Sequence, residues 1–335
     1  MNPFAFAEIA SPTPIDWRSV LDPVALVAGF TGMPLERLID PAWSVALTRQ
    51  LLAPYLGAPP SCPATASGPG WQGDVPGAVS WRPAGPWAPR GIDVRAPMQG
   101  VVGDCYLVAS LAALAWSAPH LLDPDRPGAR VVRAGPGLEV VLGAGRVPVP
   151  AEVPTYCGRM LFARGTDGSA WPARIEAAFA RWLLQDRTGR PDLRRLEASV
   201  MPPAPAPFDC CPLGLLTGWR TETWEGIDAE ASWRVLAALC PPPEGIARHP
   251  AALATGMGLD ALEAGLVPNH AYTLFGIHRE GDRRWVVLRN PWAHFPPHGP
   301  AALGAWHSLG GDGAGAAPWE ALAPRLRFVQ AAFSG

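Results

Sequence analysis

The sequence predicts a two-lobed α+β protein, in which a helix-rich first lobe precedes a second lobe richer in strand. Residues 106–116 form an apolar run without charge, glycine or proline, as expected for a helix that is buried on nearly all sides. Apolar strand-like runs dominate the segment 266–292. Between these regions, residues 202–207 read Pro-Pro-Ala-Pro-Ala-Pro and interrupt the pattern. We therefore place the boundary between the two lobes there.

The 335 residues are enough for two domains or for one large two-lobed domain. Helical patterning in two pieces before residue 57 predicts a helical N-terminal region at 1–56, which could recruit a partner protein. Residues 57–87 are rich in Pro, Gly, Ala and Ser, which is typical of an irregular connector. The first lobe then spans residues 88–201, and the second spans residues 202–335.

Composition excludes several classes of partner. The formal net charge is −2, so no overall positive field favours nucleic acid or a membrane surface. No apolar stretch reaches the roughly 18 residues that cross a bilayer, and the N-terminus lacks a signal-peptide pattern. The six cysteines are scattered rather than arranged as a disulfide framework. We therefore expect a soluble, cytoplasmic protein that binds neither nucleic acid nor membranes.

Amphipathic helices and short strands are expected elsewhere in the chain. Trp171, Ile175 and Phe179 recur at helical spacing, with Glu176 on another face. Glycine-containing turns separate two short strands in the first lobe. The expected elements are a helix at 106–116, strands at 131–132 and 138–142, helices at 171–182 and 228–239, and a closing strand at 328–333.

Cys105 opens the apolar run at 106–116 and is the candidate nucleophile. Gly103 breaks the chain just before it, and Asp104 takes the N-cap position, which puts Cys105 in the first helical turn. A thiolate there would face unpaired N–H groups and the positive end of the helix dipole, which lower its pKa. Gln99 could fold back beside the sulfur and join the Cys105 backbone N–H in holding an oxyanion. Taken alone, however, such a cysteine is more often a small core residue.

His270 and Asn290 form a second candidate constellation. An apolar strand begins at His270, another ends at Asn290, and Glu280-Gly281-Asp282 joins them as a turn. A hairpin centred near residue 280 brings the two side chains together. An asparagine beside one imidazole nitrogen fixes the tautomer and leaves the other nitrogen free to act on a thiol. Trp292 could cover this contact. The alternative is a surface hairpin with an ordinary Asn-Pro turn.

A helix-starting cysteine, a glutamine six residues upstream, and a later histidine and asparagine follow the order of papain-type cysteine hydrolases. The motifs also resemble those of the calpain-type cysteine proteases over roughly residues 85–334. The block from Gln99 to Leu107 is similar to the calpain nucleophile motif, with Tyr106 in place of its usual Trp. The tripeptide starting at His270 and the segment 288–292 match the base and orienter motifs.

This resemblance implies a two-lobed papain-like core that hydrolyses peptide bonds in protein or peptide substrates through an acyl-enzyme. It implies the following roles: Cys105 as nucleophile, His270 as general base and acid, Asn290 as its orienter, Gln99 as an oxyanion donor, and Trp292 as the shield of the site. Gly103, which belongs to the nucleophile motif, is grouped with Trp292 as a substrate-side or shielding residue. Two alternatives stay open. The fold could serve only as an interaction module, or the same triad could transfer the acyl group to an amine, as in a peptide ligase or transamidase.

Calpains hold calcium in each lobe through acidic residues, and the corresponding positions here differ. The segment 293–297 after the Asn-Pro-Trp motif has no carboxylate, and the expected acidic position upstream of Gln99 is Ala96, with Asp93 as the nearest acid. Cys210, Cys211, Cys240 and His249 lack zinc-site spacing. We therefore expect no metal, no other cofactor and no calcium control, and no EF-hand region after the core.

Overall fold

The computed structural model has an α+β architecture. The residues that it describes are 79–100, 102–156, 159–185, 190–193, 212–256, 261, 265–267, 269–293, 307–309 and 312–334. The helical region expected at 1–56, most of the connector at 57–87 and the lobe boundary expected at 202–207 lie outside these residues.

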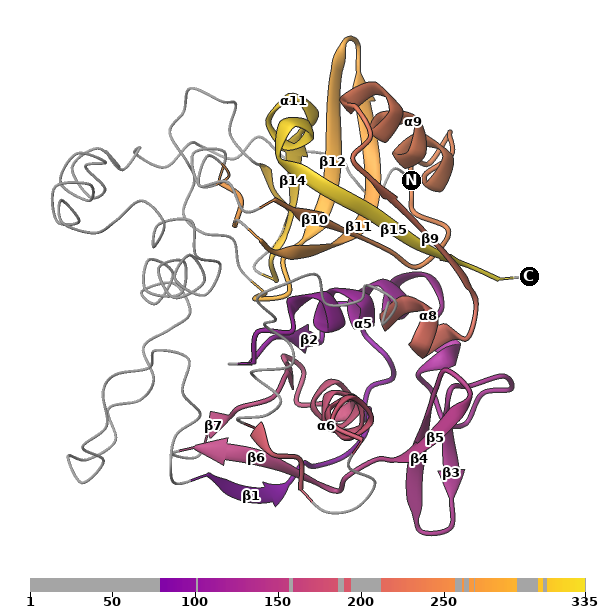
Figure 1. The fold of residues 1–335 in the computed structure, drawn as a ribbon, viewed down its shortest axis with the longest axis vertical. Coiled ribbons are helices and arrows are strands. Elements are labelled where there is room, and N and C mark those ends of the chain that lie inside the picture. Colours follow the sequence, from indigo (N-terminus) through magenta and orange to yellow (C-terminus); the bar gives the residue numbers. More distant parts are fainter. Residues whose placement is uncertain are drawn as a thin grey trace, which may run out of the picture.

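The described chain has two halves with α5 (Cys105–Ser117) between them (Figure 1). Residues 79–193 form the first half, with α6 (Trp171–Leu183) and small antiparallel sheets. Residues 220–334 form the second half around a seven-stranded sheet, whose order is β13-β14-β12-β11-β10-β15-β9. All strand pairs in these sheets are antiparallel.

The strands of the first half are β1 (Ser80–Pro83), β2 (Pro97–Met98), β3 (Val131–Ala134), β4 (Gly137–Leu142), β5 (Gly145–Pro148), β6 (Glu152–Tyr156), β7 (Arg159–Met160) and β8 (Arg164–Gly165), with a 3-10 turn at Pro119–Leu121. The second half contains β9 (Arg220–Glu225), α9 (Ala229–Leu239), β10 (Ala251–Thr255), β11 (Ala271–Glu280), β12 (Arg283–Arg289), β13 (His307–Ser308), β14 (Ala314–Pro318), α11 (Trp319–Leu322), a 3-10 turn at Ala323–Arg325 and β15 (Leu326–Phe333). The short helix α8 (Pro212–Thr217) precedes β9.

The elements expected from the apolar patterns in both halves are confirmed, with ends that differ by a few residues. The helix expected at 106–116 is α5, and the helix expected at 228–239 is α9, capped by the Asp228 side chain on the Ala231 N–H at 2.7 Å. In the first half, β3, β4 and β5 form a meander whose turns contain Gly135 and Gly143, both with positive φ.

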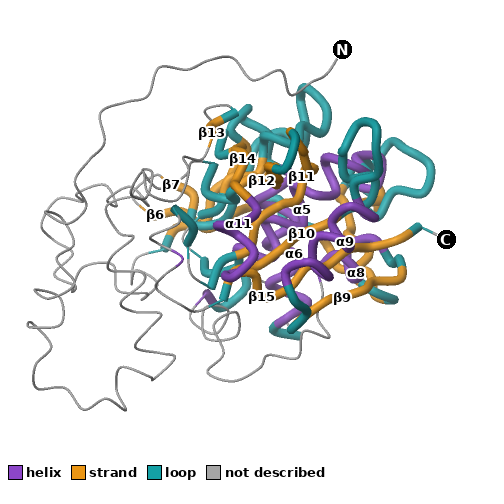
Figure 2. The backbone as a smooth tube through the Cα atoms, turned by 90° about the horizontal axis from the view of Figure 1, so that it is seen from above, coloured by secondary structure: helices purple, strands orange, loops and turns teal. Residues whose placement is uncertain are grey.

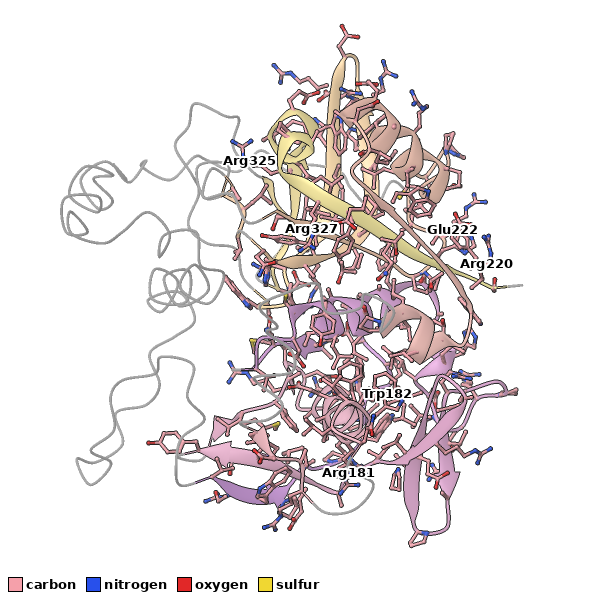
Figure 3. The ribbon with its side chains drawn as sticks, viewed as in Figure 1. Arg181, Trp182, Arg220, Glu222, Arg325 and Arg327 are labelled. Carbon is pink, nitrogen blue, oxygen red and sulfur yellow. The ribbon has the colours of Figure 1, made fainter. Side chains whose placement is uncertain are left out.

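The helix α6 covers the first half's core with its aromatic face. Trp171 and Phe179 are fully buried, and Phe179 packs against Trp182 with ring centroids 5.8 Å apart. The neighbouring Arg181 points elsewhere and donates to the Pro148 carbonyl at 3.0 Å (Figure 3). Glu176, which the sequence placed on another face of this helix, is also buried, with 1% of its surface exposed. The acid therefore faces the interior beside the start of α5.

Two segments near the expected boundaries pack on the first half. Strand β1 falls within the stretch assigned to the connector and pairs with β6, and the Trp87 indole donates to the Leu122 carbonyl at 3.1 Å. The helix α8 follows the expected lobe boundary, but its Leu213 and Leu216 lie in the same hydrophobic cluster as α5. The first half therefore also contains residues that precede residue 88 and residues that follow residue 201.

The hairpin expected between His270 and Asn290 is formed by β11 and β12. Gly281 has a φ of 59° at its tip, where the backbone needs the left-handed region. A bulge interrupts the pairing: Leu274 lies opposite Leu288, but Gly276 already lies opposite Val287. This bulge shifts the register by one residue between the turn and the open end of the hairpin.

The helix α5 packs against both halves of the protein. Its Leu107, Leu111 and Leu114 lie in the core of the first half. On the other side α5 lies against β10 and β11, as the view from above also shows (Figure 2). A buried hydrogen bond from the Thr273 hydroxyl to the Ala109 carbonyl, 2.8 Å long, joins β11 to the helix. Among the described residues, α5 and α6 are the longest helices at 13 residues each, and none has the length and apolarity needed to cross a bilayer.

Gly100 lies where the chain before α5 passes the backbone of residues 161–162. A Cβ atom at this position would collide with the Leu161 and Phe162 carbonyl oxygens, which belong to backbone and cannot rotate away. Gly100→Ala should therefore lower the free energy of unfolding by about 1–3 kcal/mol, as measured by urea denaturation. Gly137→Ala is the control, because its Cβ would meet nothing closer than the Ala134 carbonyl at 3.7 Å. Equal stability of the two variants would contradict the prediction.

Candidate active site

The first turn of α5 places Cys105 at the open end of the β11–β12 hairpin. Cys105 is half-buried, and the backbone N–H of Ala271, the first residue of β11, donates to its sulfur. The N–H groups of Cys105 and Tyr106 also face the sulfur, as expected for the N-terminal end of a helix. The residue after His270 is thus in direct contact with the candidate nucleophile.

Burial raises the pKa of the Cys105 thiol to about 11. The Ala271 N–H opposes this rise, whereas the nearby Asp104 carboxylate adds to it. The sequence had suggested a lowered pKa from the helix dipole, and for this structure that expectation is wrong, because the loss of water outweighs the N–H groups. At neutral pH Cys105 is therefore a thiol.

His270 and Asn290 are hydrogen-bonded, as the hairpin pattern predicted. The His270 Nε2 lies 2.9 Å from the Asn290 Oδ1, and the side chains are 4% and 0% exposed. An amide oxygen can only accept, so the proton is on Nε2 and Nδ1 is left as the basic nitrogen. The Trp292 backbone N–H donates to the same oxygen at 3.0 Å and holds the amide in place.

Burial lowers the pKa of His270 to about 4, although the bond to Asn290 opposes this shift. The imidazole is therefore neutral across the physiological range. Its folded-state pKa lies below the ordinary value of 6.5, so the stability that it contributes is present above pH 6.5 and is lost as pH falls through 4. A neutral imidazole with a free Nδ1 is the form that can accept a proton.

Trp292 covers the ring of His270, as expected. The two ring centroids are 4.5 Å apart, and Trp292 is 8% exposed. The Ala293 N–H donates to the Asn290 carbonyl at 3.0 Å, closing a tight turn in which Ala293 has a φ of 60°. A left-handed alanine is costly, so this turn is held by its surroundings.

The backbone of Gln99 joins the two motifs. Its N–H donates to the Pro291 carbonyl at 2.8 Å, which fixes the segment before α5 to the loop after Asn290. Its side-chain Nε2 donates to the Val102 carbonyl at 2.7 Å, so one N–H of the amide stays available for a ligand. Gly103 is half-buried beside this segment and directly precedes Asp104, the N-cap residue of α5.

Asp104 and Glu176 form a buried pair of acids behind Cys105. Asp104 precedes α5 at the N-cap position but makes no side-chain capping bond, and each residue is 1% exposed. The two carboxyl groups interact with each other, and Glu176 also accepts the Ala163 N–H at 2.6 Å. Burial raises the pKa of Asp104 to about 7, and burial with the adjacent Asp104 charge raises that of Glu176 well above its usual value. The pair therefore retains a proton near neutral pH.

The two positions upstream of Gln99 that the sequence singled out for calcium are Ala96 and Asp93. Ala96 is fully buried, and the Asp93 carboxylate is bound by Arg95 at 3.2 Å. Within the described ranges, no three or more His, Cys, Asp or Glu residues cluster in a way that could hold a metal ion. Of the segment at 293–297, only Ala293 lies inside the described residues. Cys210 and Cys211 also lie outside them.

Sequence reasoning missed two residues that contact the site. Glu176 was assigned to a polar face of its helix. The feature that could have revealed its role is an acidic side chain directed toward the apolar start of α5. Thr255 ends β10 and is hydrogen-bonded to the His270 backbone. Nothing in its sequence context, Ala-Leu-Ala-Thr-Gly, distinguishes it from any other strand residue.

Comparison with known proteins supports a coarse assignment of the class of protein, not of individual site residues. No protein-family model matches the chain. The chain is similar to a protein of Porphyromonas gingivalis named Thiol protease, with 25% identity over 250 residues. The match covers 62% of this chain and 45% of that protein, so the chain spans less than half of the relative's length.

The buried acid pair predicts how stability changes with pH. The raised pKa values mean that the folded protein holds protons which the unfolded chain releases near pH 4, so stability falls as pH rises toward 7 and above. In Glu176→Gln this fall should be shallower, because the amide does not titrate. Urea denaturation at several values between pH 5 and 8.5 measures it.

The matched control for this prediction is Glu152→Gln. Glu152 is an exposed acid paired with Arg190 at 2.7 Å, and its replacement should shift stability by a similar amount at every pH. If the free energies of unfolding of wild type and Glu176→Gln changed in parallel with pH, the acid pair would not retain a proton near neutral pH.

Proposed function

We propose that this protein is a cysteine endopeptidase with a calpain-type, papain-like core. The observation that carries the proposal is the arrangement around β11: the His270 Nε2 is bound by Asn290 at 2.9 Å, and the next residue, Ala271, donates its N–H to the Cys105 sulfur. The base and the N–H that faces the nucleophile thus belong to two consecutive residues, His270 and the first residue of β11. The similarity to a protein named Thiol protease supports the same class of reaction.

In the proposed reaction, the Cys105 thiol transfers its proton to His270 Nδ1, and the sulfur attacks the carbonyl carbon of a peptide bond. The free N–H of the Gln99 amide and the Cys105 backbone N–H hold the resulting oxyanion. Breakdown of the tetrahedral intermediate moves the proton from His270 to the leaving amine and leaves a thioester on Cys105. Water then attacks the thioester and gives a proton to His270, and the free thiol is restored when the acid product leaves.

Asn290 and Trp292 support this reaction without touching the scissile bond. Asn290 keeps the proton on Nε2, so that Nδ1 is always the acceptor, and its own position is fixed by the Trp292 N–H. The indole shields the bond from water, which would otherwise compete for the amide oxygen. The substrate is a protein or peptide segment extended enough to enter the site.

The first test is replacement of the nucleophile. Cys105→Ala should reduce cleavage of an unstructured protein, such as casein, to background, because the proposed thioester forms on the Cys105 sulfur. Cys240→Ala is the matched control: Cys240 is the other free cysteine among the described residues, is buried, and should be dispensable for cleavage. Equal turnover by Cys105→Ala and wild type would refute the proposed nucleophile.

The same preparation separates the alternatives. A peptide electrophile such as a peptidyl vinyl sulfone should label Cys105, and His270→Ala should abolish the labelling. Absence of labelling and cleavage in the wild-type protein would instead indicate an interaction module. Product masses with and without an added amine separate hydrolysis from acyl transfer, since a ligase would give amide products.

The second test concerns calcium. Because Ala96 and the Arg95-bound Asp93 offer no cation site, cleavage should persist unchanged in excess EGTA. The measurement is the initial rate with EGTA and after adding back calcium. A rate that collapses in chelator and recovers with calcium would overturn the expectation of calcium-independent activity.

A further inference from the structure

The side chain of Thr255 lies directly behind His270 and is completely buried. Its hydroxyl accepts the His270 backbone N–H at 3.1 Å and donates to the Val267 carbonyl at 2.5 Å. The Thr255 backbone N–H donates to the His270 carbonyl at 2.9 Å. The two peptide groups that flank the His270 Cα are therefore both bound by the same residue.

The chain enters His270 through a conformation that needs such support. Asn269 has a φ of 49°, in the left-handed region, and its N–H donates to the Gly256 carbonyl at 2.7 Å. The bonded segment 269–270 thus runs alongside Thr255 and Gly256 before β11 begins. Without these bonds the backbone at His270 would have several accessible conformations, because a left-handed residue is not fixed by the β-sheet ladder.

The imidazole itself has only one hydrogen-bonded anchor among the described residues, the Asn290 oxygen on Nε2. A bond at one ring nitrogen sets the tautomer, and the Trp292 and Tyr272 rings packed against the imidazole limit its rotation. The position of Nδ1 relative to the Cys105 sulfur then depends on where the backbone places the Cβ of His270. A displacement of about 1 Å at this point is enough to reduce a reaction rate by two orders of magnitude.

We propose that Thr255 is a positioning residue: its hydroxyl fixes the His270 backbone so that Nδ1 faces the Cys105 thiol. This inference rests on the proposed function, because the alignment matters only if His270 takes the proton of Cys105. Thr255 touches neither substrate nor reacting atoms. Its effect passes through the backbone of the base, while Asn290 holds the ring.

The test compares Thr255→Val, which keeps the shape but removes the hydroxyl, with Thr255→Ser, which keeps the hydroxyl. Thr255→Val should lower kcat by about 10- to 100-fold with little change in KM, because substrate contacts are untouched. Thr255→Ser should restore kcat to within a few-fold of wild type. A kcat of Thr255→Val equal to that of Thr255→Ser would overturn the proposal.

Thr217→Val is the control for a purely structural effect. The Thr217 hydroxyl also donates to a backbone carbonyl, that of Leu213 at 2.6 Å, and accepts a backbone N–H, that of Trp219 at 3.0 Å. Thr217 is 3% exposed and belongs to α8 rather than to the site. Loss of its hydroxyl should lower stability as in Thr255→Val but leave kcat unchanged. An equal loss of kcat in both variants would mean that Thr255 is only structural.

A second readout separates this proposal from the proposed function. The rate of Cys105 alkylation by iodoacetamide reports whether His270 accepts the thiol proton, whether or not any peptide is cleaved. If wild-type alkylation is fast and depends on His270, then slow alkylation in Thr255→Val supports the proposal, and fast alkylation refutes it. If wild-type alkylation does not depend on His270, the proposed chemistry of Cys105 fails, and the role of Thr255 fails with it.

Discussion

The packing of α5 between the two halves is the constraint on which the rest of the structure depends. The helix carries Cys105 in its first turn, and β11, which lies against it, begins immediately after His270. The Thr273 hydroxyl bound to the Ala109 carbonyl and the Trp116 ring stacked on Phe275 at 4.7 Å fix this contact along the helix. Because one helix touches both cores, its position sets the separation of the thiol and the imidazole.

The alignment of the halves is maintained by uncharged acceptors. Gln99 donates its backbone N–H to the Pro291 carbonyl, and the fully buried Arg289 donates to the Arg95 carbonyl at 2.8 Å. Together with the Thr273 bond, these contacts join the halves at three places around the site. Each acceptor is a backbone carbonyl, whose position does not depend on pH or on a bound ion.

Local patterns predicted the parts of the site that lie close together in sequence. The turn at 280–282 and the apolar runs beside it were sufficient to bring His270 to Asn290, since a hairpin needs no information from the rest of the chain. The order of the seven-stranded sheet was not accessible, because β10 must insert between β11 and β15 through long-range pairing. Glu176 was missed because its partner Asp104 is far away in sequence. Thr255 is only 15 residues from His270, but no turn motif in the sequence joins the two.

The half-burial of Cys105 does not by itself separate a core residue from the proposed nucleophile. Burial raises the pKa of the Cys105 thiol to about 11 and lowers the pKa of His270 to about 4. Both groups are thus neutral at rest, and an ion pair between them would lack the water that normally stabilises it. In the proposed reaction, charge develops only when a carbonyl is present to receive it, and the first-turn N–H groups face the sulfur. In such a site the rate depends on how accurately the neutral partners are aligned, and therefore on the backbone bonds that hold His270.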